Sequence, residues 1–197
     1  DGKRVEGPSA ERGVVFQEYA LLPWMNVLDN AALGLKLRGV ARDERYATAR
    51  RYLAIANLHN VEHKYPHELS GGMKQRVAVA RTLANSPEVM LMDEPFAAVD
   101  AQTRMTLQEE LGRIAMQSKL TVIFITHSVE EAIFLGDRVA VMTPGPGRIR
   151  TIVRVPFARE MRTWAALNTD PAFAALREQL LGLVRLKSEA TDAARVT

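Results

Sequence analysis

The chain has 197 residues, 47% of them hydrophobic, and a formal net charge of +3. This length and apolar content suffice for one domain with a sizeable core, and they exclude intrinsic disorder. Basic residues are interspersed with acidic ones, so we expect no nucleic-acid partner, and the absence of cysteine from the sequence excludes disulfides, thiolate metal sites and a cysteine nucleophile.

The first half of the chain predicts one strand followed by helices. Residues 13–16 form a short apolar run, typical of a buried strand, that ends at Gln17. Asn26 and Ser70 are typical helix N-caps. We expect helices over residues 26–38, 41–57 and 70–85.

The second half of the chain alternates strands with helices. We expect strands over residues 88–92, 120–126, 138–142 and 149–155, and helices over residues 101–117, 129–135 and 170–187. The runs at 88–92 and 120–126 are mostly apolar, which is typical of buried strands in a parallel sheet. Strands that alternate with helices predict an α/β fold with a largely parallel sheet and helices on its faces.

Residues 25–86 interrupt this alternation, because they are almost entirely helical. We therefore predict a single domain with an inserted helical subdomain. Its parts are an α/β core over residues 1–24 and 87–155, the helical subdomain over 25–86, and a C-terminal helical extension over 156–197. No apolar run approaches the roughly 18 residues that a membrane-spanning helix needs.

Two carboxylates follow the apolar strand at residues 89–92. Ligands of open α/β sheets bind outside the carboxyl ends of the strands, where Asp93 and Glu94 lie. A carboxylate there can hold Mg²⁺ through its waters, and the next can orient a water that attacks a γ-phosphate. The alternative is a strand that simply ends in solvent with two acids.

A serine and two glycines open the helix that starts near residue 70. Free N–H groups and the positive end of the helix dipole face outward there. Because Gly71 and Gly72 have no side chains, an anion can approach the backbone closely after Ser70. The alternative is an ordinary serine N-cap with glycines in the adjoining turn.

A histidine follows the strand at residues 120–126. We expect this strand to lie beside the strand that carries the two acids, so that His127 can donate a hydrogen bond to a phosphoryl oxygen. Gln17 also follows a strand, and its amide could contact Mg²⁺ or the water. The alternative for each is a structural side chain at a strand end.

The order of these features resembles the nucleotide-binding subunit of ABC transporters along nearly the whole chain. Residues 15–17 (VFQ) resemble the Q-loop, and residues 69–76 (LSGGMKQR) resemble the signature, with methionine where many members have glutamine. Residues 89–94 (VMLMDE) resemble the Walker B strand and the catalytic glutamate. Residues 98–100 (AVD) resemble the D-loop, with valine where leucine is usual, and His127 resembles the switch histidine.

This resemblance implies a P-loop NTPase-like fold and an ATPase that uses ATP and Mg²⁺. It implies that Asp93 and Gln17 attend Mg²⁺ and that Glu94 is the general base or orients the water. It also implies that His127 stabilises the γ-phosphate. These four residues would serve the nucleotide of their own chain.

The resemblance assigns a second set of residues to a partner. In the family, two ATP-binding subunits pack head to tail, and the signature of one faces the nucleotide of the other. Ser70, Gly71 and Gly72 would therefore close over the partner's ATP, and Gln75 and Asp100 are also expected to be nucleotide-binding residues.

Further segments resemble importers of nitrate, sulfonates and taurine. They are the LPW segment at 22–24, the TPGPGRI segment at 143–149 and the segment from 170 to 177. The resemblance implies membrane permease subunits that contact the region from Leu21 to Asn30, an indirect partner in a substrate-binding protein, and a peripheral place on the cytoplasmic face of the inner membrane.

The sequence contains no G-x-x-x-x-G-K-[ST] segment, whose N–H groups and lysine hold phosphates. In the family this loop precedes a segment like residues 1–5, so we expect that the first strand–P-loop–helix unit is missing and that this chain alone is inactive. One alternative is an inert chain that gives only its signature helix to a partner. Another is a soluble ABC ATPase without a transporter, which a long coiled-coil insertion or a second cassette would mark.

Overall fold

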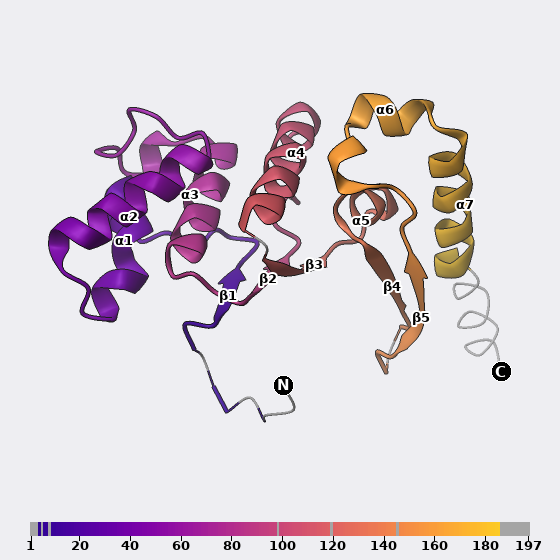
Figure 1. The fold of residues 1–197 in the computed structure, drawn as a ribbon, viewed down its shortest axis with the longest axis horizontal. Coiled ribbons are helices and arrows are strands. Elements are labelled where there is room, and N and C mark those ends of the chain that lie inside the picture. The colour runs from indigo at the N-terminus through magenta and orange to yellow at the C-terminus, as the bar shows by residue number, and fades with distance from the viewer. Residues whose placement is uncertain are drawn as a thin grey trace. The chain divides into compact units, whose positions relative to one another are not determined.

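The computed structural model describes residues 4, 6, 7, 9–97, 99–118, 120–144 and 146–185. The chain divides into two compact units, residues 1–125 and 126–197, and each is described by itself (Figure 1). The division into a core, a helical subdomain and a C-terminal extension stays a proposal.

The elements follow the predicted order closely. The first unit contains β1 (Arg12–Val15), α1 (Val27–Leu37), α2 (Arg42–Ile55), a 3₁₀ turn (Pro66–Glu68), α3 (Gly71–Ala84), β2 (Val89–Asp93), α4 (Ala101–Ser118) and β3 (Thr121–Ile125). The second contains α5 (Val129–Leu135), β4 (Arg138–Met142), β5 (Ile149–Arg154), a 3₁₀ turn (Arg159–Met161), α6 (Trp164–Thr169) and α7 (Pro171–Arg185). The predicted end of the last helix, at residue 187, lies outside the described residues.

Three parallel strands form the sheet of the first unit, in the order β1-β2-β3. Val15 pairs with Met92, and Asp93 pairs with Ile125. This pairing confirms that the strand preceding His127 lies beside the strand that carries the two acids. Because the strands are parallel, their carboxyl ends meet at one edge of the sheet.

The expectation that the first and third strands are buried was wrong for one face of the sheet. Val15, Met90 and Met92 are fully buried on the face against which α3 packs. On the other face Val14 is 36% exposed and Ile123 is 53% exposed. Successive side chains of a strand point to opposite faces, and in the described part of the chain only one face is well covered. An apolar run cannot reveal this, because both faces carry apolar residues.

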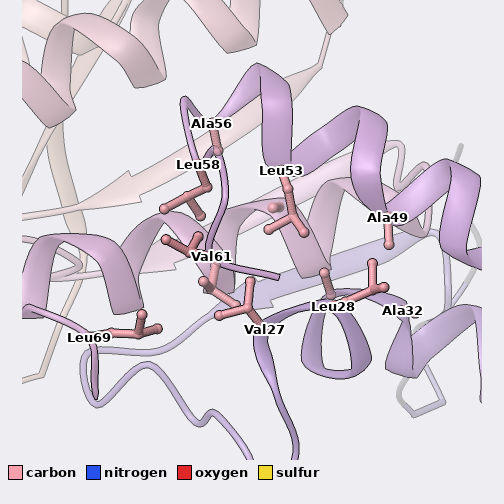
Figure 2. Packing of buried hydrophobic residues seen from close by; sticks show 12 residues of the cluster. Val27, Leu28, Ala32, Ala49, Leu53, Ala56, Leu58, Val61 and Leu69 are labelled. Atoms are coloured by element: carbon pink, nitrogen blue, oxygen red, sulfur yellow. The ribbon is translucent and has the colours of Figure 1, made fainter. Parts of the chain in front are cut away.

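The helices α1, α2 and α3 pack around a shared apolar core (Figure 2). Ala31 and Ala49 are fully buried, so the helices approach closely, and Leu53 is only 1% exposed. Burying such a leucine contributes about 1.5–3 kcal/mol. The core thereby fixes α3, which carries Ser70–Gly72 at its start, against the two preceding helices.

The second unit pairs β4 with β5 in antiparallel fashion. Its core includes Ile133 of α5 and Leu180 of α7, both at most 1% exposed. Phe134 stacks on Trp164 with ring centroids 4.5 Å apart, which holds α6 against α5. None of the helices in the described residues is long and apolar enough to cross a membrane.

Candidate functional site

Three of the predicted site residues lie at the carboxyl edge of the three-stranded sheet. Gln17 follows the end of β1 by two residues, Asp93 is the last residue of β2, and Glu94 comes directly after it. The side chains of Gln17 and Asp93 are exposed, and Glu94 is half-buried. The sheet therefore brings an amide and two carboxylates to the edge where α/β proteins bind ligands.

The backbone of Glu94 is held in an unusual conformation. Its φ is +41°, in the left-handed region that costs a non-glycine residue about 1–2 kcal/mol. Its N–H donates to the carbonyl of Ile125 at 3.0 Å, and its own carbonyl accepts from the N–H of Ala97 at 3.2 Å. The last residue of β3 thus fixes Glu94, and such fixed strain is frequent at functional sites.

The helix α3 begins as the sequence predicts. The hydroxyl of Ser70 accepts a hydrogen bond from the N–H of Met73 at 3.3 Å. Ser70 is exposed, Gly71 is half-buried and Gly72 is buried. An anion can therefore approach the start of this helix from the side of Ser70 and Gly71.

The two glycines of this helix have different structural neighbours. A Cβ on Gly72 would lie 2.8 Å from Cγ2 of Thr103 in α4, which is too close for an ordinary contact. A Cβ on Gly71 would lie 3.3 Å from the hydroxyl oxygen of Tyr19. Gly72 therefore permits close packing of α3 against α4, whereas Gly71 lies beside the hydroxyl of Tyr19.

Gly72→Ala should lower the free energy of unfolding by about 1–3 kcal/mol, because the added methyl overpacks the contact with Thr103. This loss exceeds the gain in helix propensity, which is at most about 1 kcal/mol. Urea unfolding of the single variants and of Gly72→Ala with Thr103→Ser is the measurement. Serine keeps the hydroxyl and removes Cγ2, so the cost of Gly72→Ala should shrink in the Thr103→Ser background. An equal cost in both backgrounds would contradict this contact.

Gln75 and Arg76 of α3 lie where α3 contacts α4. Gln75 is 1% exposed, and neither polar atom of its side chain has a hydrogen-bond partner among the described residues. Arg76 forms a partly buried ion pair with Glu110 of α4 at 3.2 Å. In the single chain Gln75 is therefore a packing residue, and its role in nucleotide binding stays a prediction.

Asp100 caps α4, which follows the segment that resembles the D-loop. Its carboxylate accepts from the N–H of Thr103 at 3.0 Å. Hydrogen bonds from Thr103 lower the pKa of Asp100, so the carboxylate stays charged near neutral pH. Val99 beside it is buried, and Ala98 lies outside the described residues.

His127 belongs to the second unit, where it is exposed in the turn before α5. The hydroxyl of Thr126 donates to the buried carboxylate of Glu131 and accepts from the N–H of Ser128 at 3.0 Å. The hydroxyl of Ser128 accepts from the N–H of Glu131 at 3.2 Å. These bonds fix the turn around His127. Its approach to Asp93 and Glu94 stays a prediction.

Comparison with known proteins decides the family. The family profile described as ABC transporter matches residues 2–97. The chain is 52% identical over 183 residues to a taurine import ATP-binding protein of Chromobacterium violaceum, covering 91% of this chain and 70% of the relative. The chain belongs to the family of ABC transporter ATP-binding proteins. It is also 45% identical to a nitrate import ATP-binding protein of Synechocystis sp., covering 98% of this chain and 75% of that protein.

A solved ABC cassette confirms the predicted fold. The dimeric structure of an ATP-binding cassette in a post-hydrolysis state, bound to ADP and Pi, matches with a TM-score of 0.64 at 30% identity. The match covers 75% of this chain and spans 64% of the length of that cassette. The segment that resembles the ABC signature lies at the start of α3, and the segment that resembles the Walker B strand is β2.

The side chains at the carboxyl edge of the sheet suit a Mg²⁺ ion that is bound together with ATP. Mg²⁺ is usually held by one or two carboxylates together with waters and substrate phosphates. Asp93 offers such a carboxylate, and Gln17 offers an amide oxygen on the same edge. In the part of the chain that the structure describes, no three His, Asp or Glu side chains group into a metal site. The donor set suits an ion whose other ligands come from ATP and water.

Sequence reasoning missed the residues that shape the loop after Gln17. Asn30 of α1 is fully buried, and its side chain accepts from the N–H of Leu22 at 2.8 Å and donates to the carbonyl of Met25 at 2.9 Å. This clamp presents Trp24, which is 71% exposed. The sequence signal for this clamp is an asparagine within the apolar stripe of a helix.

Proposed function

We propose that the chain is the ATP-binding and ATP-hydrolysing subunit that powers an ABC importer for small anions such as nitrate, sulfonates or taurine. The observation that carries this proposal is the end of β2, where Asp93 and the strained Glu94 lie on the same sheet edge as Gln17. The similarity to proteins named for taurine and nitrate import supports the class of solute.

Each of the four predicted residues has one task in the proposed reaction. Asp93 and Gln17 hold Mg²⁺, which when bound neutralises phosphate charge. Glu94 accepts a hydrogen bond from the attacking water and takes its proton. His127 donates a hydrogen bond to an oxygen of the γ-phosphate, where charge accumulates.

The signature serves a second copy of the chain. The N–H groups at the start of α3 and the hydroxyl of Ser70 face the γ-phosphate of the ATP that the partner holds, in a head-to-tail homodimer. The exposure of Ser70 and the partial exposure of Gly71 support this arrangement. Gln75 and Asp100 complete the nucleotide contacts that we propose.

The remaining partners are those of an importer. The region from Leu21 to Asn30 contacts the permease subunits, and the exposed indole of Trp24 on its clamped loop supports this surface. A substrate-binding protein acts indirectly, through the permease. The subunit then lies on the cytoplasmic face of the inner membrane as a peripheral protein.

Gly71→Asp should abolish hydrolysis in the full-length protein and leave ATP binding by the monomer nearly unchanged. The new carboxylate would face the γ-phosphate across the dimer, where like charges repel. Steady-state ATPase, dimer formation with ATP, and ATP affinity of the monomer are the measurements.

Gly71→Ala is the matched control, because its methyl meets only the hydroxyl of Tyr19, at 3.3 Å. Because alanine adds no charge, it should retain more of the hydrolysis than Gly71→Asp. A large drop in monomer affinity with Gly71→Asp would show that the signature binds the nucleotide of its own chain, and the proposed head-to-tail site would be wrong.

A further inference from the structure

The segment that follows Gln17 is a strained turn. Tyr19 has a φ of +59° and Ala20 a φ of +45°. The N–H of Tyr19 donates to the carbonyl of Phe16 at 3.2 Å, and the N–H of Ala20 donates to the carbonyl of Glu18 at 2.6 Å. Left-handed backbone at two successive non-glycine residues costs energy, so other contacts must hold both residues in this conformation.

Arg81 of α3 makes contacts that hold the turn in this conformation. Its Nη1 donates to the carbonyl of Ala20 at 2.6 Å, and its Nη2 donates to the carbonyl of Tyr19 at 2.9 Å. The planar guanidinium thus spans two successive carbonyls as a fork, a geometry that a lysine cannot reproduce. Arg81 is half-buried, and this burial lowers the pKa of its guanidinium.

Tyr19 connects the same turn to the other end of α3. Its hydroxyl oxygen lies 3.3 Å from the position of a Cβ on Gly71. Burial raises the pKa of Tyr19, so the phenol is neutral at physiological pH. Arg81 and Gly71 are ten residues apart on one helix, or about 15 Å along its axis. The turn therefore lies along α3, bonded to Arg81 near one end and with the hydroxyl of Tyr19 beside Gly71 near the other.

We propose that Arg81 is a positioning residue that fixes the turn from Gln17 to Ala20 onto α3. Any displacement of the helix that begins with Ser70 then moves Gln17 as well. Arg81 thereby couples the position of the start of α3 to the position of Gln17. Its effect on hydrolysis rests on the proposed function, whereas its effect on the turn does not.

Hydrogen exchange tests the effect on the turn directly. In the full-length protein, Arg81→Met keeps the length of the side chain and removes its donors. The amides of Tyr19 and Ala20 should exchange at least about tenfold faster, because the strained turn loses both bonds, while the amides of α1 keep their rates. Arg81→Lys should give an intermediate increase.

Arg113→Met is the matched control for this experiment. Arg113 also donates through Nη2 to a distant carbonyl, that of Ile55, at 2.8 Å, and it is exposed in the same unit. Arg113→Met should leave both the hydrogen exchange of the turn and the ATPase rate unchanged. Unchanged exchange with Arg81→Met, or an equal increase with Arg113→Met, overturns the proposal.

ATPase kinetics test the coupling. Arg81→Met should lower kcat by about 5- to 100-fold with KM for ATP changed less than about threefold, because a misplaced group costs rate more than binding. If Arg81 acts through Gln17, Arg81→Met with Gln17→Ala should be no slower than Gln17→Ala alone. Additive losses overturn the coupling. An unchanged kcat with Gln17→Ala refutes the proposed role of Gln17, and hydrogen exchange then decides for Arg81 independently.

Discussion

Glu94→Gln in the full-length protein should retain ATP binding and lose turnover by about 10²- to 10⁴-fold, the range expected when a general base is removed. The amide has the shape of the carboxylate and can still orient a water, but it cannot take the proton of that water. ATP should therefore remain bound and unhydrolysed, and the variant should accumulate as an ATP-bound dimer.

Steady-state ATPase and gel filtration with ATP measure this result. Glu88→Gln is the matched control, because Glu88 is an exposed glutamate just before the other end of the same strand, β2. It should hydrolyse ATP at the parental rate. A Glu94→Gln variant whose turnover stays within a few-fold of the parent would show that Glu94 has no role as base.

The sequence predicted the elements well wherever a local signal marks their ends. Asn26 and Ser70 accept hydrogen bonds from the first turns of their helices, as their residue types indicate. The run from Val89 to Asp93 forms a parallel strand that ends with its acid at the carboxyl edge. Caps and apolar runs are properties of neighbouring residues, so they can be recognised without a structure.

Contacts between distant residues could not be predicted in this way. Arg81 bonds to carbonyls about sixty positions earlier in the chain, and nothing in its helical surroundings distinguishes it from any other arginine of a helix. The left-handed backbone of Glu94 depends on the end of β3. The need for a glycine at position 72 becomes clear only when α4 is packed against α3, because Thr103 then lies too close to where a Cβ would be. Each of these follows from packing, which the local pattern does not encode.

The 197-residue chain by itself should hydrolyse ATP no faster than a buffer control and should bind MgATP very weakly. Its sequence contains no G-x-x-x-x-G-K-[ST] segment, so the N–H groups and the lysine that hold phosphates in such sites are absent from it. In the proposed reaction, Asp93, Glu94, Gln17 and His127 act on phosphates that another group must hold. Losing several charge-assisted hydrogen bonds of about 1.5–3 kcal/mol each removes most of a micromolar affinity, which amounts to about 8 kcal/mol.

Calorimetric titration of this chain with MgATP is the measurement, and the same titration of the full-length protein is its reference. The reference should bind in the micromolar range, and the 197-residue chain should give no more than the heat of dilution. An ATPase assay of both under the same conditions completes the comparison. Low-micromolar binding by the 197-residue chain, together with hydrolysis that Glu94→Gln abolishes, would contradict the prediction. Some other group within these residues would then have to supply the charge that holds the phosphates, because exposed carboxylates such as Asp93 repel them.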